Sequence, residues 1–208
     1  FDRTTQQARF LFSNRKSLDG LPLARLHPRV IPARDGLCLV SYLTLPVDAD
    51  PEQSGRPDKP LPLVLEMHGG PRARERWGYN PLHQWLANRG YAVLSVNYRS
   101  SVGFGKAFIK AGNGEWARKM HEDLLDAVEW AIKEGITQKD KVCIMGGSYG
   151  GYAALVGLAM TPDVFACGID IVGPSNLETL VASIPAYWKP ALDMMRVMIG
   201  ADPTTPEG

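Results

Sequence analysis

The chain has 208 residues, of which 45% are hydrophobic and 22% are charged, and its formal net charge is +1. This composition is typical of a globular protein with enough apolar material for one substantial core. A charge so close to zero provides no basic stripe for phosphates, and no apolar run approaches the ~20 residues of a membrane span. We therefore expect neither nucleic acid nor a membrane as a partner.

Predicted strands and helices alternate along the chain. Apolar runs predict strands over residues 36–45, 61–67 and 91–96, around Val142 and Ile144, and over 165–172. Helices are predicted over 81–88 and 121–133 and in the run of small residues after 148, and a polar loop is predicted over 46–60. Strands separated by helical crossovers predict an α/β fold with a mostly parallel sheet and helices on both faces.

The three cysteines do not suggest a metal site. Cys38, Cys143 and Cys167 lack the spacing of a metal-ligand set. The last two lie in strand-like apolar runs, where cysteine usually acts as a small hydrophobic residue. We interpret all three as structural and expect no metal and no other cofactor.

A serine surrounded by glycines stands between a predicted strand and a predicted helix. Residues 146–150 read G-x-S-x-G, the pattern of a nucleophile elbow, with Ser148 at its centre. Side chains two positions before and after a serine on so sharp a turn would collide, which explains the glycines. The alternative is a structural turn, since so short a motif also arises by chance. The flanking strand and helix favour the elbow.

A second glycine turn follows an earlier strand, as HGGP at residues 68–71. Acyl transfer to a serine creates a negatively charged oxygen, which backbone N–H groups from two loops commonly stabilise. The predicted donors are the N–H groups of Gly70 and Tyr149, the alternative for the glycines being an ordinary tight turn. We interpret His68 as a hydrogen-bonded structural residue rather than as a general base.

Several motifs together resemble one family. They are AxDGL at 33–37, YLTLP at 42–46, HGGP at 68–71, NRGYAVLSVNYR at 88–99, GFGK at 103–106, GGSYGGY at 146–152 and GPSN at 173–176. In this order they closely resemble the peptidase domain of the prolyl oligopeptidase family, and the branch they resemble most is that of the acylaminoacyl peptidases and bacterial dipeptidyl peptidases.

The resemblance implies an α/β-hydrolase fold with Ser148 as nucleophile and the backbones of Gly70 and Tyr149 as oxyanion donors. It implies a serine-type exopeptidase or oligopeptidase that cleaves short peptides through an acyl-enzyme and releases dipeptides or acylated amino acids. Residues 1–29 would be a linker or the end of a preceding β-propeller, and residues 30–208 the N-terminal part of the peptidase domain. The substrate-binding residues are not identified by this resemblance.

One departure from the family pattern limits the activity expected of these residues. In α/β hydrolases the triad runs serine, acid, histidine along the chain, but all four histidines here precede Ser148. The resemblance places the acid, the histidine and the last strands beyond Gly208. We therefore expect the 208-residue chain alone to be inactive and its unpaired sheet edge to promote association. The alternatives are a carboxylesterase of small acyl esters and a non-catalytic remnant of the fold.

An aromatic and methionine-rich segment near the end of the chain has two interpretations. Tyr187, Trp188, Met194, Met195 and Met198 could line a substrate pocket near Ser148, but methionines at helical spacing are more often core residues, and we favour the core.

The remaining predictions concern tryptophans, an arginine and the whole protein. We interpret Trp77, Trp85, Trp116 and Trp130 as core residues. We favour Arg99 as an ordinary surface or ion-paired residue, the alternative being that it holds the loop next to the oxyanion turn. A homo-oligomer is left open. The expected compartment is the cytoplasm, with the periplasm and secretion left open.

Overall fold

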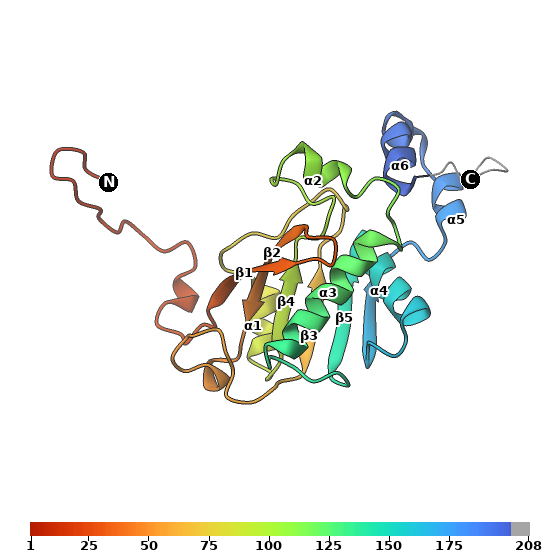
Figure 1. The fold of residues 1–208 in the computed structure, drawn as a ribbon. Helices are drawn as coiled ribbons and strands as arrows, with labels where there is room; N and C mark the ends of the chain where they lie inside the picture. Colours follow the sequence, from red (N-terminus) through yellow and green to blue (C-terminus); the bar gives the residue numbers. More distant parts are fainter. Residues whose placement is uncertain (201–208) are drawn as a thin grey trace.

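The computed structural model describes residues 1–200 and is built on a six-stranded sheet with the order β1-β2-β4-β3-β5-β6 (Figure 1). The strands are β1 (Leu26–Pro32), β2 (Cys38–Thr44), β3 (Leu63–Met67), β4 (Ala92–Val96), β5 (Val142–Gly147) and β6 (Cys167–Ile171). β2 pairs antiparallel with β1 and with β4, whereas β4, β3, β5 and β6 run parallel. The mostly parallel sheet predicted from the sequence is confirmed.

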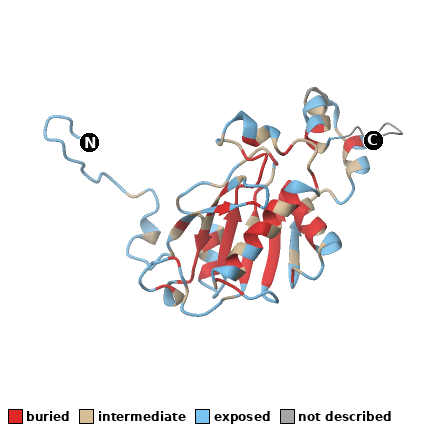
Figure 2. Cartoon of the chain, viewed as in Figure 1, coloured by how far each residue is buried: buried red, intermediate tan, exposed pale blue. Residues whose placement is uncertain are grey.

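Helices cover both faces of this sheet, as predicted (Figure 1). They are α1 (Pro81–Ala87), α2 (Lys106–Lys110), α3 (Lys119–Lys133), α4 (Tyr149–Met160), α5 (Leu177–Ala182) and α6 (Leu192–Ile199), with 3-10 turns at Lys16–Leu18, Val47–Ala49 and Ala186–Ala191. Leu86 of α1 packs on one face with Val64 and Val93. Leu124 of α3 and Ala153 of α4 belong to the larger core on the opposite face. Figure 2 shows the central strands buried between these layers.

Helix α1 begins and ends where its sequence predicts. The side chain of Asn80 accepts hydrogen bonds from the amides of Leu82 at 2.9 Å and His83 at 3.3 Å, and so caps the first turn. Pro81 occupies the first helical position, where its missing N–H costs no hydrogen bond. Gly90 follows the helix with a φ of +87°, a conformation that glycine adopts without steric strain.

Strand β1 was not predicted. It begins at Leu26, so the predicted domain boundary at residue 30 falls inside a strand of the sheet. Pro28 and Pro32 interrupt the strand pattern in the sequence, because proline cannot donate to a β-ladder. The structure accommodates both prolines because β1 lies at the edge of the sheet.

Two of the four tryptophans predicted to be in the core are exposed. Trp77 retains 68% and Trp85 53% of its accessible surface, so the prediction is wrong for both. The guanidinium of Arg89 lies 4.6 Å from the ring centre of Trp85 and provides a surface partner. Trp116 is buried, and Trp130 is partly buried against the main core.

Two of the cysteines that we interpreted as structural are paired, rather than acting only as small hydrophobic residues. Cys143 of β5 and Cys167 of β6 are partners in the parallel register, and the structure joins them in a disulfide. The sequence did not reveal this pairing because the two residues are 24 positions apart and meet only when the strands align. Cys38 is free and exposed.

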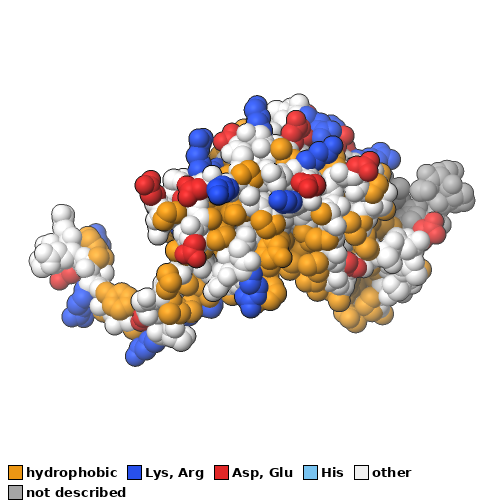
Figure 3. All heavy atoms as spheres, turned by 90° about the horizontal axis from the view of Figure 1, so that it is seen from below, with side chains coloured by type: hydrophobic (Ala, Val, Ile, Leu, Met, Phe, Trp, Pro, Cys, Tyr) orange, Lys and Arg blue, Asp and Glu red, His pale blue; other side chains and the backbone are white. Residues whose placement is uncertain are grey.

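The N-terminal residues extend away from the body as an exposed arm (Figures 1 and 2). The arm first contacts the body at Arg15, whose guanidinium lies 4.7 Å from the ring centre of Tyr79. Further along, Gln84 of α1 exchanges two hydrogen bonds with the backbone of Ala24, at 2.9 and 2.7 Å. Figure 3 views the molecule from below, where hydrophobic side chains are interspersed with charges of both signs. Among the described residues, no helix is both long and apolar enough to cross a membrane.

Candidate active site

Ser148 lies at the junction of β5 and α4, in the strand–turn–helix arrangement that the sequence predicts. Its backbone adopts φ 55° and ψ −118°. Positive φ is uncommon for residues other than glycine, and such strained positions concentrate at functional sites. The side chain is exposed, and within residues 1–200 the structure shows no hydrogen bond to its hydroxyl. The hydroxyl is therefore presented to solvent.

The glycines on either side of Ser148 are required by close backbone contacts. A Cβ added at Gly146 would lie 2.5 Å from the carbonyl carbon of Gly150. A Cβ added at Gly150 would collide with the carbonyl oxygen of Met67 at the end of β3. A side chain two positions before or after Ser148 would therefore collide with the backbone, as the sequence predicts.

The HGGP turn lies directly against this elbow, because β3 and β5 are parallel neighbours whose carboxyl ends meet at the same edge. A Cβ added at Gly69 would lie 3.2 Å from the Cβ of Ser148. Gly70 is exposed and has a φ of +118°, which side-chain-bearing residues rarely adopt. The structure therefore brings the two predicted glycine turns together.

A cavity of about 640 Å³ opens beside Ser148. Its walls include all three predicted site residues. The described residues that line it are Gly70, Trp116, Ser148, Tyr149, Val172, Gly173, Pro174, Leu180, Tyr187, Trp188, Ala191, Met194, Met195 and Met198.

The cavity corrects our interpretation of the segment after residue 186. Tyr187 and Met194 are exposed at the cavity, so the preferred core interpretation is wrong for them. Met195 and Met198 are buried in the main core and also line the cavity. The methionine spacing could not separate these alternatives, because one face of α6 contributes to both the core and the cavity.

The side chain of His68 contacts the HGGP turn and the loop that carries Ser101. Its Nδ1 lies 2.8 Å from the carbonyl oxygen of Gly69, an acceptor, so Nδ1 carries the proton. Its Nε2 lies 2.9 Å from the hydroxyl of Ser101, and its ring stacks on Tyr98 with 4.5 Å between ring centres. The hydroxyl of Tyr98 donates to the His68 carbonyl at 2.7 Å. Burial lowers the pKa of His68, which favours the neutral ring. These contacts agree with a structural rather than a basic role.

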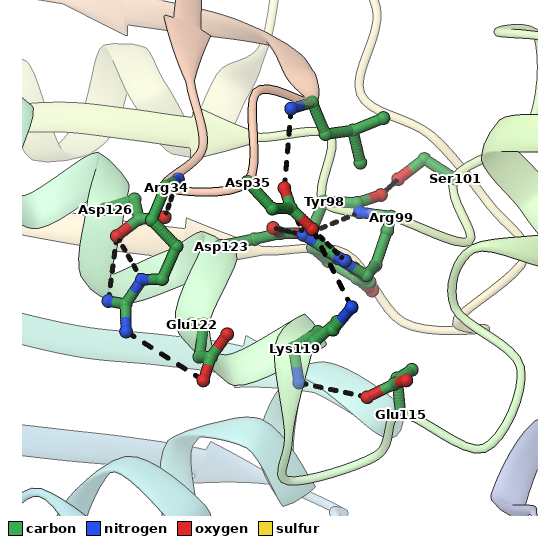
Figure 4. Close-up of polar contacts among 11 residues, drawn as sticks. Arg34, Asp35, Tyr98, Arg99, Ser101, Glu115, Lys119, Glu122, Asp123 and Asp126 are labelled. Carbon is green, nitrogen blue, oxygen red and sulfur yellow. Dashed lines mark hydrogen bonds and ion pairs between the residues drawn. The ribbon is translucent and has the colours of Figure 1, made fainter.

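Arg99 holds the loop that carries Tyr98 and Ser101, the less favoured of the two interpretations of this residue from the sequence (Figure 4). Its guanidinium, which is buried, contacts Asp123 of α3 at 2.7 Å and Asp35 of the β1–β2 turn at 2.9 Å. Burial acts to lower the pKa of Arg99, but the hydrogen bonds to Asp123 and Asp35 outweigh it and raise the pKa. Burial raises the pKa of Asp123. The pKa of Asp35 is lowered, mainly because Arg99 donates a hydrogen bond to the Asp35 carboxylate. Arg99 is thus an interior ion-paired residue.

A further polar cluster lies on the α1 side of the sheet. Ser95 donates to a carboxylate oxygen of Glu66 at 2.7 Å, and its hydroxyl lies 2.5 Å from Nε2 of His83. The other ring nitrogen of His83 lies 2.8 Å from the hydroxyl of Thr44.

Burial, together with the charge of Glu66, raises the pKa of Glu75 in the loop after HGGP to about 7. Among the described residues, no group of acidic, histidine or cysteine side chains is arranged to hold a metal ion.

Comparison with known proteins agrees with this geometry. Dipeptidyl aminopeptidase BIII of Pseudoxanthomonas mexicana is 58% identical over 208 residues, which are 100% of this chain and 30% of that protein. Dipeptidyl peptidase family member 6 of Caenorhabditis elegans is 44% identical over 222 aligned residues, again 100% of this chain and 30% of that protein. The chain therefore spans about 30% of the length of these relatives.

The fold and the family follow from two further matches. A solved puromycin-hydrolysing peptidase of Mycobacterium tuberculosis has a TM-score of 0.77 and 25% identity, covering 88% of this chain and 27% of that one. The neighbouring structures are α/β-hydrolase peptidases, and the chain has this fold. The model of the prolyl oligopeptidase family matches residues 77–195. The chain therefore belongs to the prolyl oligopeptidase family.

Proposed function

We propose that the protein containing this chain is a serine peptidase that releases dipeptides or acylated amino acids from short peptides. The observation that carries this proposal is the exposed hydroxyl of Ser148, on a glycine-lined turn, in the same cavity as Gly70 and Tyr149. Two relatives named as dipeptidyl peptidases support the type of product.

In the proposed mechanism the oxygen of Ser148 attacks the carbonyl carbon of a peptide bond while a general base takes the hydroxyl proton. The C–N bond then breaks, the amine of the C-terminal part leaves with that proton, and the acyl group stays on Ser148. Water hydrolyses this acyl-enzyme, which releases the N-terminal part as a carboxylic acid and restores the serine hydroxyl. The N–H groups of Gly70 and Tyr149 stabilise the negative charge on the carbonyl oxygen. Tyr149 is the first residue of α4, where N–H groups have no partner within the helix and the helix dipole favours negative charge. Its ring, packed edge-on against Trp116 at 4.6 Å between ring centres, holds this end of the helix in place.

Deprotonation of Ser148 requires a general base, for which the longer protein would supply the histidine and its acidic partner. His68 does not fit this role, because its Nδ1–H is used by Gly69 and its Nε2 faces Ser101. The coverage of about 30% of each relative is consistent with a source elsewhere in the protein. We further propose that a β-propeller precedes the peptidase domain and restricts access to short peptides.

The test is active-site labelling of the full-length protein with a fluorophosphonate probe. We expect labelling of the wild type and of Ser175→Ala, a control at a nearby exposed serine, and none of Ser148→Ala. The wild type should also cleave dipeptidyl or acylaminoacyl amides, whereas a carboxylesterase would hydrolyse small esters alone. A wild-type protein that is folded but neither labelled nor active would contradict the proposal.

A further inference from the structure

We infer that Asp170 is a positioning residue for Ser148 and acts through the turn that follows β6. This inference rests on the proposed function and adds a residue that supports the nucleophile. Asp170 lies on β6 opposite Gly146, and the next residue, Ile171, lies opposite Gly147. The end of β6 therefore runs beside the last two residues before the nucleophile.

The backbone of Ser148 is held on one side by this strand end. Its amide donates to the Ile171 carbonyl at 2.9 Å, and its carbonyl accepts from the Tyr152 amide of α4 at 3.0 Å. The second contact belongs to the helix itself, whereas the first comes from a different element. A positive φ is unfavourable for serine and persists only where the surroundings hold it. The direction of the Ile171 carbonyl therefore helps to keep Ser148 at its φ of 55°.

The turn after Ile171 is strained as well. Val172 has a φ of +53°, which is rare for a β-branched residue. The Ile171 carbonyl and the Val172 N–H belong to one planar peptide unit, so a rotation about the N–Cα bond of Val172 turns that carbonyl relative to Gly173. Because the same carbonyl accepts from Ser148, the geometry of the turn reaches the nucleophile.

The side chain of Asp170 closes this turn. Its Oδ1 accepts from the Gly173 amide at 2.7 Å, across Ile171 and Val172. Aspartate is favoured at the start of turns because its carboxylate accepts hydrogen bonds from backbone amides further along the chain. Removing the acceptor frees the Gly173 amide, and Val172 can then relax to a negative φ.

Two glycines outside the G-x-S-x-G pattern make room for the carboxylate. A Cβ added at Gly151, in the first turn of α4, would collide with Asp170 Oδ1. A Cβ added at Gly173 would lie 2.5 Å from the same oxygen. These contacts explain two glycines of the GGSYGGY and GPSN motifs that the nucleophile elbow alone does not require. They also place the carboxylate against the helix that begins at the nucleophile.

Asp170 acts through the backbone and not on the substrate. It is not among the described residues that line the cavity beside Ser148. A change at Asp170 therefore removes no contact with a peptide bound there, so kcat should respond more strongly than KM.

The experiment compares three variants of the full-length enzyme. Asp170→Ala removes the acceptor, and because small displacements of a reacting group are costly, kcat should fall by about 10-fold to 100-fold, with a smaller change in KM. Asp170→Asn keeps an acceptor oxygen in the same position and loses only the charge, so it should retain most of the wild-type kcat. Asp170→Glu keeps the charge but moves the acceptor by one methylene group, so it should resemble Asp170→Ala.

Asp163→Ala is the control, since Asp163 is also an exposed aspartate but lies beyond the end of α4, and it should match the wild type. Circular dichroism verifies folding, and the comparison of Asp170→Asn with Asp170→Glu is decisive even where Asp170→Ala does not fold. An unchanged kcat in Asp170→Ala, or a kcat of Asp170→Asn no higher than that of Asp170→Glu, would overturn the inference. Fluorophosphonate labelling of the wild type distinguishes this result from failure of the proposed function, which would abolish that labelling.

Discussion

The imidazole of His68 acts on Gly70 through a single peptide group. The Gly69 carbonyl, which accepts from Nδ1–H of His68 at 2.8 Å, belongs to the same planar unit as the Gly70 N–H. In a trans peptide these two groups point in opposite directions, so fixing the carbonyl also fixes the N–H. Donation to the carbonyl further polarises the unit and strengthens its N–H as a donor. The arrangement orients the proposed oxyanion donor without any contact between His68 and the substrate.

Replacing His68 by phenylalanine should therefore lower kcat. His68→Phe keeps an aromatic ring next to Tyr98 but removes the donor to Gly69. In the full-length enzyme we expect kcat to fall by about 10²-fold, the lower range for loss of one oxyanion donor, with a smaller change in KM. His121→Gln is the control, since His121 is also buried but lies on α3. An unchanged kcat in His68→Phe would show that the turn holds its orientation without the ring.

The raised pKa of Glu75 makes stability depend on pH. Its pKa is about 7 in the folded chain against an ordinary 4.5, because the carboxyl is half-buried and faces the charge of Glu66. The folded state then holds a proton that the unfolded state has released, so this group destabilises the fold as pH rises from about 4.5 to 7. Glu75→Gln should unfold at the same temperature as wild type at pH 4 and at a higher temperature at pH 8. Glu52→Gln, at an exposed residue, should match the wild type at both pH values, and a lower midpoint for Glu75→Gln at pH 8 would contradict the assignment.

At the scale of elements, prediction from the sequence succeeded where a local pattern and the tertiary environment agree. The parallel strands are short apolar runs bounded by turns, and the ends of α1 carry their own capping residues, so both were predicted within a few residues. The elbow was predicted for the same reason, since its glycines are adjacent in the sequence.

The remaining elements depend on partners that are distant in the sequence. β1 contains two prolines and is a strand only because β2 pairs with it. Arg99 is interior because Asp123 and Asp35, from two other elements, neutralise it. The cavity forms only where α4, α6 and the turn after β6 come together in space. No single segment of the sequence specifies that arrangement.

The elbow offers a matched test of these close contacts. Gly146→Ala would place a methyl group against the backbone of Gly150, whereas Gly147→Ala has room, with its nearest neighbour at 3.8 Å. Overpacking typically costs about 1–3 kcal/mol, so we expect a lower thermal midpoint for Gly146→Ala. Thermal unfolding of the full-length protein, followed by circular dichroism, provides the comparison. Equal midpoints for the two variants would show that the β5–α4 junction relaxes around an added methyl group.

At the scale of the whole molecule, the two edges of the sheet differ in how they resist pairing. β1 contains prolines, which interrupt the row of N–H donors along its edge. β6 has no proline, pairs within residues 1–200 only with β5, and leaves Ile169 and Ile171 46% and 48% exposed. An apolar edge of this kind is a template for another strand.

The isolated 208-residue chain should therefore associate through β6. We expect gel filtration with light scattering to show species larger than a monomer at micromolar concentration. Ile169→Lys should shift the chain toward the monomer, because a charged side chain on an edge strand opposes pairing with a second copy. Val30→Lys places the same charge on β1, where Val30 is exposed on the edge that already contains prolines, and should leave the association unchanged. A wild-type chain that elutes as a monomer and unfolds cooperatively would mean that the edge of β6 is stable without pairing to another strand. Equal effects of Ile169→Lys and Val30→Lys would mean that the chains associate through a surface other than β6.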